Sequence, residues 1–342
     1  MYQRDRGIDL NLSGIPRDAL DNDRLLAETV ARHNVVLGTD LKFDRAAPDP
    51  ATPCGNPVSV VLRALPGAEG EPPVPSASAI LCPLPALTQA AAFVAATNPL
   101  PDRDGKLRRT PLLLRYGDAW VPSLAVAALL AGSGDNQVVV HWSSAGIHEL
   151  RLGETVIPTD PQGNMLFPYR MRPPDRFDHI SAASLLEGAV EPARLEGKIV
   201  FIGSSASGLQ DMHATPVMRL CPGVDLHALA ADAILRRDFF VEPAWTRGGQ
   251  ALIVLAAGLL VTFLAARTRV AFSALGTAAA AVALALGTWA LFNRWGVYWS
   301  PLPGVSTLVA GSSLLTIVRL RHEERRRQLL RQSFSRYVSA EI

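Results

Sequence analysis

The sequence predicts an α/β domain with a mixed, largely parallel-centred sheet, followed by an all-α unit of three transmembrane helices and a helical stalk. Two observations support this prediction. Three apolar segments follow one another closely between Gln250 and Val318. Ahead of them, a β-branched and aromatic run, a small polar loop and an amphipathic helix occur in the order typical of α/β domains.

The apolar segments cover 250–266, 270–292 and 297–318, and none contains a Lys, Arg, Asp, Glu or His. A hydrocarbon core of about 30 Å requires about 20 apolar residues in a helix. The outer helices of a soluble helical core would need polar faces, and these segments have none. We therefore expect residues 247–318 to form three transmembrane helices.

Charges beside these segments predict their orientation in a plasma (inner) membrane. Arg267 and Arg269 form the first connection, whereas the second contains Arg294 among aromatic residues. The third segment is followed by a basic tail of Arg319, Arg321, Arg325, Arg326, Arg327 and Arg331. Because positive residues stay in the cytoplasm, we expect a cytoplasmic C-terminus at 319–342 and an extracytoplasmic domain at 1–246.

The net charge of +2 conceals two halves of opposite sign. Residues 1–246 contain 22 Lys and Arg against 28 Asp and Glu, a net of −6, and residues 247–342 contain 11 against 3, a net of +8. The first part is long enough to fold around its own core. The basic tail suits a membrane surface, and without a base-reading module it does not indicate nucleic-acid binding.

The two ends and the cysteines add three expectations. Residues 1–10 contain no apolar run that could export the domain, so we expect a preceding membrane helix, and the chain to be part of a longer protein. Cys54, Cys82 and Cys221 show no metal-ligand spacing. We expect them to be isolated apolar residues rather than a Cys54–Cys82 disulfide, which an oxidising compartment would permit.

Propensity and periodicity predict the elements of the first domain. We expect helices over 21–34, 84–97, 122–131 and 224–237. Strands are expected over 35–37, 58–62, 112–114, 138–142, 149–152 and 155–157, the last two joined as a hairpin at Gly153. The run Ile199–Ile202 has the composition of a strand buried on both faces.

The loop after that run carries the first candidate site. Ser204, Ser205 and Ser207 lie between Gly203 and Gly208, and their hydroxyl and backbone groups could bind an anion or a polar ligand. The spacing matches neither a nucleophile elbow, nor a P-loop, nor a dinucleotide fingerprint. A tight turn that needs small residues explains the loop equally well.

Further candidates are Asp211 and His227, together with Arg108 and Arg109, which could meet an acidic ligand or pair internally. Carboxylate and imidazole groups at Asp211, His213, Asp225 and His227 match no closed zinc pattern, so we expect structural roles and no metal site. No residue is predicted to be catalytic. The predicted ligand-binding set is Ser204, Ser205, Ser207, Asp211, His227, Arg108 and Arg109.

A family resemblance is carried by short motifs in one order. They are Asp102-x-Asp104-Gly105-x-x-Arg108-Arg109-x-Pro111, Pro122-Ser123-Leu124, Ile180-Ser181, Leu195-x-Gly197-Lys198-Ile199-Val200, Gly208-Leu209-x-Asp211, Thr215-Pro216 and Pro222-Gly223-Val224-Asp225-x-His227-Ala228. Over about residues 15–240 the chain resembles the second class of CHASE domain, an extracytoplasmic sensory module of bacterial signalling proteins. The resemblance implies an unknown extracytoplasmic ligand and three following membrane spans. The family's N-terminal membrane helix and first stretch are missing, and Asp225 stands where Glu is more frequent.

The C-terminus carries a second resemblance. Phe334-Ser335-Arg336-Tyr337-Val338-Ser339 is similar to the segment that introduces class III adenylate or guanylate cyclase domains, with Ala340 in place of the usual Pro. This implies a cyclase domain beyond Ile342, with two Mg or Mn ions in that domain and no cofactor in this chain. It also implies a homodimer, for which the small residues Ala279, Ala283 and Gly287 offer a close-packing face.

We therefore expect the sensory and transmembrane portion of an adenylate or guanylate cyclase receptor. The predicted signal-coupling residues are Arg319, Glu323, Arg327, Phe334, Arg336 and Tyr337, with Glu323 and Arg327 paired at i,i+4. One alternative is the sensor of a histidine or Ser/Thr kinase. The other is a membrane-anchored extracytoplasmic enzyme or transport component. A charged residue within a span would favour transport, and none of the three predicted spans contains one.

Overall fold

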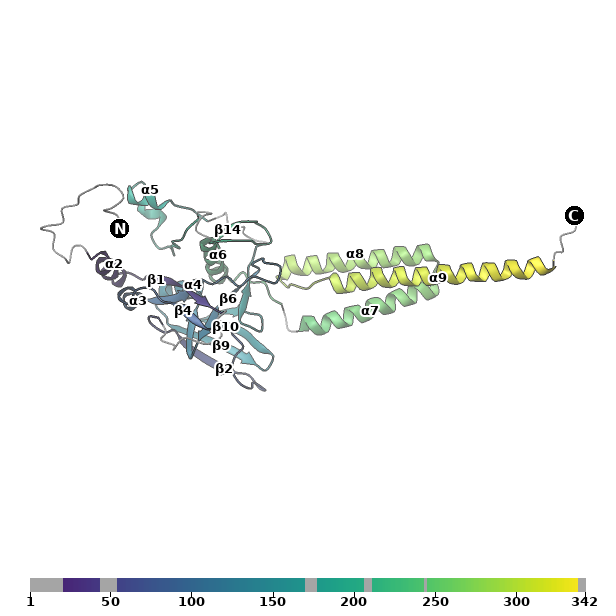
Figure 1. Ribbon diagram of the computed structural model, residues 1–342, viewed down its shortest axis with the longest axis horizontal. Coiled ribbons are helices and arrows are strands. Elements are labelled where there is room, and N and C mark those ends of the chain that lie inside the picture. Colours follow the sequence, from purple (N-terminus) through teal and green to yellow (C-terminus); the bar gives the residue numbers. More distant parts are fainter. Residues whose placement is uncertain (1–20, 44–53, 170–176, 206–210, 243–244, 338–342) are drawn as a thin grey trace, which may run out of the picture. The chain divides into compact units, whose positions relative to one another are not determined.

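The computed structural model describes residues 21–43, 54–169, 177–205, 211–242 and 245–337 (Figure 1). The chain divides into two compact units, Met1–Phe239 and Phe240–Ile342. The first unit contains mixed sheets with helices, and the second contains three long helices. This architecture confirms the predicted fold class.

The first sheet has the strand order β4-β1-β5. Its central strand β1 (Val36–Lys42) pairs antiparallel with β4 (Ala79–Leu81) and parallel with β5 (Phe93–Ala96). All four residues of β5 are buried, as expected for a strand covered on both faces. The parallel pair β1–β5 directs two carboxyl ends to the same edge of this sheet.

The second sheet has the order β11-β10-β9-β2. Here β2 (Ser59–Ala64) pairs parallel with β9 (Gln137–Ser143), while β10 (Gly146–Leu152) and β11 (Thr155–Pro158) continue as an antiparallel meander. Val138, Val140 and Trp142 are buried and alternate with more exposed neighbours. This period of two places one face of β9 in the core.

Three smaller sheets complete the first unit. In one, β7 (Leu113–Tyr116) pairs with β3 (Ser76–Ala77) and β8 (Ala119–Pro122). In the other two, β6 (Arg109–Pro111) pairs with β12 (Asn164–Leu166), and β13 (Met212–His213) pairs with β14 (Cys221–Pro222). The short strands β6 and β13 carry residues of the candidate site described below.

Helices α4 (Leu124–Ser133) and α6 (Gly223–Arg236) pack against each other and contribute to the main core. Ser123 caps α4 by accepting a hydrogen bond from the Val126 amide. The remaining helices are α2 (Asn22–Ala31), α3 (Pro85–Ala90), α5 (Ala182–Leu186) and the 3₁₀ helix η3 (Pro192–Arg194). The predicted helices over 21–34 and 224–237 are thus present.

Two element predictions were wrong. The helix expected over 84–97 is limited to α3, because β5 gains hydrogen-bonded pairing with β1 that outweighs the helix propensity of its alanines. The run Ile199–Ile202 is not a strand: Phe201 packs against the main core, but Val200 and Ile202 are 54% and 92% exposed. Branched side chains favour extended backbone, yet a strand also needs a paired neighbour, and none of the described strands pairs with this run.

The prediction of isolated cysteines was wrong for two of the three. Cys54 and Cys82 form a disulfide that links residues 28 apart in the sequence, with a Cα–Cα distance of 5.6 Å. Cys221 is a buried free cysteine. Burial raises the pKa of its thiol to about 12. The bond connects the residues before β2 to the end of β4, which is a non-local contact that cysteine spacing does not reveal.

The second unit consists of α7 (Trp245–Arg267), α8 (Val270–Trp295) and α9 (Leu302–Tyr337). All three are long and apolar enough to cross a membrane, over Gly248–Arg267, Val270–Trp295 and Leu302–Leu330. Close packing uses Gly304, where an added Cβ would lie 2.6 Å from Leu284 and 2.7 Å from Ile253. Small residues therefore allow these helices to approach closely.

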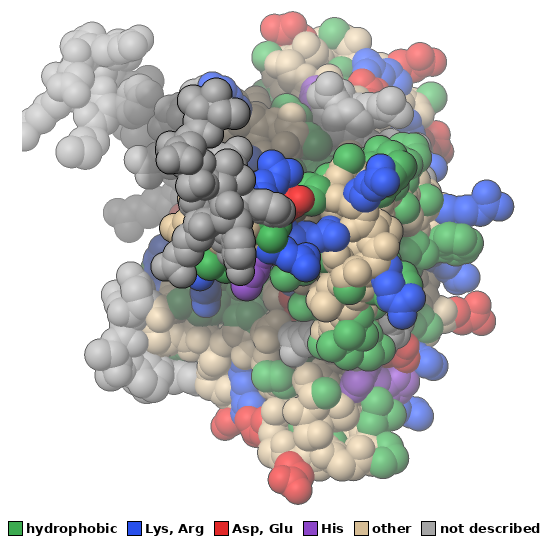
Figure 2. All heavy atoms as spheres, turned by 90° about the vertical axis from the view of Figure 1, so that its right-hand side faces the viewer, with side chains coloured by type: hydrophobic (Ala, Val, Ile, Leu, Met, Phe, Trp, Pro, Cys, Tyr) green, Lys and Arg blue, Asp and Glu red, His purple; other side chains and the backbone are tan. Residues whose placement is uncertain are grey.

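The predicted small-residue face of α8 does not take part in this packing. Ala279, Ala283 and Gly287 are exposed, and among the described residues no atom lies within 4 Å of a Cβ added at Gly287. Helix α9 runs without a break from the third apolar segment into the charged tail, where the expected Glu323–Arg327 ion pair forms at 3.8 Å. Lys and Arg side chains are prominent among the side chains that face the viewer in Figure 2.

Candidate functional site

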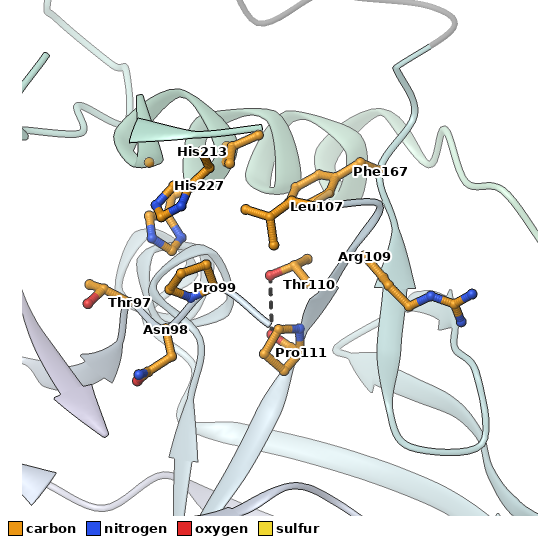
Figure 3. A pocket seen from close by; sticks show the side chains of 12 residues that line it. Thr97, Asn98, Pro99, Leu107, Arg109, Thr110, Pro111, Phe167, His213 and His227 are labelled. Carbon is orange, nitrogen blue, oxygen red and sulfur yellow. Dashed lines mark hydrogen bonds between the residues drawn. The ribbon is translucent and has the colours of Figure 1, made fainter. Parts of the chain in front are cut away.

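A small cavity of about 20 Å³ lies in the first unit beside the carboxyl end of β5 and the start of α6 (Figure 3). Ligands of α/β proteins are typically bound at this edge of a parallel sheet. The cavity is lined by Thr97, Asn98, Pro99, Leu107, Arg109, Thr110, Pro111, Phe167, His213, Gly223, Leu226 and His227. Its volume suits one or two water molecules, so a larger ligand would have to open it.

Asn98 fixes the loop that follows β5. Its side-chain oxygen accepts a hydrogen bond from the Leu41 amide at 2.8 Å, and its nitrogen donates to the Leu41 carbonyl and the Asp40 carboxylate, each at 2.7 Å. The amide is thus fully used by β1. These hydrogen bonds to β1 hold the neighbouring Thr97 and Pro99 at the cavity.

His227 lies in the second turn of α6 and faces the cavity beside His213 (Figure 3). Burial lowers the pKa of its imidazole to about 4, against the opposing effects of the Asp211 carboxylate and a hydrogen bond to the Thr97 backbone. Desolvation disfavours the charged form because a buried cation loses its hydration. His227 is therefore neutral at neutral pH and can both donate and accept hydrogen bonds.

His213 lines the cavity next to His227, and Asp211 contacts His213 from outside the lining. The Asp211 carboxylate lies 3.1 Å from His213 Nε2, and its carbonyl accepts a hydrogen bond from the Gly223 amide at 3.0 Å. These contacts connect β13 to the start of α6. The predicted residue Asp211 thus contacts His213 and acts electrostatically on the predicted residue His227.

Asp225 occupies the first turn of α6 and is buried. Its carboxylate lies 2.9 Å from Nε2 of the exposed His179. The pair lies outside the cavity lining. Among the residues that the structure describes, no group of three or more His, Cys, Asp or Glu side chains could hold a metal ion.

The two predicted arginines are paired within the domain. Arg108 donates to Asp102 at 2.9 Å and to both oxygens of Asp104 at 2.8 and 2.7 Å. This guanidinium lowers the pKa of Asp104 to about 2. Arg109 donates to the buried Asp160 at 2.9 Å, and its guanidinium points away from the two histidines (Figure 3).

The predicted serines are not brought to the cavity. Ser204 is half-buried and Ser205 is exposed, neither lines the cavity, and Ser207 lies outside the described residues. Sequence reasoning missed Thr97, Asn98, Thr110 and Phe167. The pair Asn98-Pro99, which follows the apolar run 93–96 after one threonine, was the available signal, because Asn-Pro favours the start of a turn.

The α/β domain and the three helices long and apolar enough to cross a membrane place the chain in the class of membrane-anchored α/β domains. The chain belongs to the CHASE2 domain family, whose model matches residues 4–264. It carries an extracytoplasmic sensor domain of a signalling receptor followed by transmembrane helices. Neither a curated protein nor a solved structure matches the chain significantly.

Proposed function

We propose that the chain is the sensory and transmembrane part of an adenylate or guanylate cyclase receptor in the inner membrane, with residues 1–246 outside and the C-terminus in the cytoplasm. The carrying observation is the continuity of α9, which joins the third span to the charged segment through one helix of 36 residues. A rigid helix of this kind transmits a change in rotation or tilt from the membrane to whatever follows it.

The disulfide supports the proposed location of the sensor. Disulfides persist in oxidising compartments such as the bacterial periplasm and are rare in the cytosol. The Cys54–Cys82 bond lies in the first unit, while the second unit has an excess of basic residues. Both observations favour export of the first unit and retention of the basic tail.

The proposed ligand site is the cavity lined by His227 and His213, with Asp211 in contact with His213. Because the cavity holds only about 20 Å³, a ligand larger than water would select a wider arrangement of β13 and α6, which shifts the population of sensor conformations. The proposed output requires a homodimer, because class III cyclases build their active site between two chains. The two Mg or Mn ions of that active site would be held by the cyclase domain beyond Ile342.

A fusion experiment tests this function. An export anchor is placed before Met1 and a class III cyclase domain after Ile342, and cyclic-nucleotide production is measured in membranes. His227→Ala and Asp211→Asn are expected to change the basal output at least severalfold, whereas the control His148→Ala, at an exposed position, leaves it unchanged. If neither His227→Ala nor Asp211→Asn changes the cyclic-nucleotide output, the sensor role is contradicted. The coding sequence that follows Ile342 distinguishes a cyclase from a kinase output.

A further inference from the structure

Arg319 is half-buried and places one guanidinium nitrogen between the three spans. Its Nη1 atom is buried and has no hydrogen-bond partner among the residues that the structure describes. An unsatisfied N–H group of a guanidinium is costly in a poorly hydrated interior, and such groups normally find a protein or water partner. The surroundings of this nitrogen therefore require an explanation.

The surroundings are a cavity of about 10 Å³ at the end of the helical unit that carries Arg267 and Arg269. The wall includes one hydroxyl-bearing pair from α8 and another from α9, and apolar residues of α7 close the cavity. Its lining is Val261, Ala265, Ser273, Thr277, Ser312, Leu315, Thr316 and Arg319. A polar cavity of this size holds one water molecule.

Three of the four hydroxyl groups in the lining donate to carbonyls of their own helices. Ser273 donates to the Val270 carbonyl at 2.9 Å, Thr277 to the Ser273 and Ala274 carbonyls at 3.0 Å, and Ser312 to the Val309 carbonyl at 3.0 Å. Because these three hydrogens are used within their own helices, the three oxygens can still accept a hydrogen bond from another donor. The guanidinium of Arg319 can supply this donor. An anion such as phosphate offers only acceptors and would not suit these oxygens.

We propose that Arg319 donates from Nη1 through one water molecule to the hydroxyl oxygens of this cavity, and that this polar junction fixes the rotation of α9 against α7 and α8. The junction holds α9 where the apolar span ends and the charged segment begins. A rotation that withdraws Arg319 from the cavity would turn the whole charged segment. The role of the junction in signalling rests on the proposed function, but the junction itself does not.

A double-mutant cycle tests the contact in the full chain. The unfolding equilibrium of the helical unit is measured in mixed micelles of detergent and dodecyl sulfate for Arg319→Met, Thr277→Val and the double variant. The combined effect is expected to differ from additivity by about threefold or more in the equilibrium constant, which is the usual size of hydrogen-bond coupling between membrane helices.

Thr288→Val is the matched control for this cycle. Thr288 is also a buried threonine of α8 that donates to two carbonyls of its own helix at 3.0 Å, but it does not line the cavity. Its effect is expected to add to that of Arg319→Met. If the Thr277 cycle is as additive as the Thr288 cycle, the junction is refuted.

A distance measurement tests the positioning role. Spin labels are placed at the exposed positions Leu259 on α7 and Glu324 on α9, in a Cys221→Ala background. Arg319→Met is expected to shift or broaden the distance distribution, and the control Arg321→Met, an exposed arginine on the same helix, is expected to leave it unchanged. An unchanged distribution in Arg319→Met would overturn the positioning role. Neither measurement uses an external ligand or an output domain, so its result is independent of the sensor proposal.

Discussion

Gly223 lies so close to Asp211 that a Cβ atom added at position 223 would be 2.2 Å from Asp211 Oδ1 and 2.8 Å from Oδ2. The same glycine donates its amide to the Asp211 carbonyl at 3.0 Å. The first residue of α6 is therefore in direct contact with a carboxylate of the candidate site. A side chain at this position would push Asp211 away from His213.

Gly223→Ala is predicted to destabilise the first unit by about 1–3 kcal/mol, the usual cost of forcing an extra carbon into a packed site. Urea unfolding of the detergent-solubilised chain, followed by tryptophan fluorescence, measures this change. Gly132→Ala is the control, because its Cβ would meet only Ile199 at 3.8 Å and alanine favours a helix interior. Equal free energies of unfolding for the two variants would show that the Asp211 side chain can move aside without destabilising the fold.

Asp160 and Asp104 allow a comparison between a buried and an exposed ion pair with arginine. Asp160 is 8% exposed and accepts from Arg109, from the Gln162 and Asn164 amides at 3.0 and 2.9 Å, and from the Asn164 side chain. Asp160→Ala is predicted to cost about 2–4 kcal/mol, since several donors lose their partner. Asp104→Ala removes an exposed pair and should cost less than about 1 kcal/mol. Equilibrium urea unfolding checks the ranking, and a reversed order would contradict it.

The parts of the fold that follow from local sequence were predicted correctly. Helix α6 has its own amphipathic period and a Pro-Gly start, and the three spans follow from composition alone. Asp211 and His227 remain predicted site residues, chosen because their chemistry and the family resemblance agreed. Each of these signals lies within a short stretch of chain.

The missed parts depend on residues far apart in sequence. Phe93–Ala96 is a strand because it pairs with Val36–Thr39, although its alanines favour a helix. Asn98 became part of the site through the same pairing, because it reaches back to Asp40 and Leu41. Arg109 points away from the histidines because Asp160, 51 residues away, holds its guanidinium. No local pattern contains these contacts.

The depressed pKa of His227 predicts a dependence of stability on pH. Burial lowers this pKa from 6.5 to about 4, so the unfolded chain binds a proton that the folded chain does not between these values. The contribution of neutral His227 to the free energy of unfolding is therefore fully present above about pH 6.5, and it is lost as the pH falls toward 4. The full loss amounts to about 3 kcal/mol for a shift of this size.

Unfolding free energies at pH 7.5, 5.5 and 4.5 test this dependence. The difference between the wild-type protein and His227→Asn is expected to shrink as the pH falls, because only the wild-type protein loses stability through His227. His148→Asn, at an exposed position, serves as the control and is expected to follow the wild-type curve. Parallel curves for the wild-type protein and His227→Asn would show that His227 is not the group that titrates.

The Cys54–Cys82 disulfide gives a final prediction about location and stability. Closing a loop of this length stabilises a fold by about 3–4 kcal/mol in the chain-entropy model, so Cys54→Ser with Cys82→Ser should lower the free energy of unfolding by that amount. In exported protein, a polymer-linked maleimide added after denaturation without reductant should modify only Cys221. The same chain retained in the cytoplasm should gain modification at Cys54 and Cys82 as well. Modification of all three cysteines in exported protein would refute the disulfide and remove its support for an extracytoplasmic sensor.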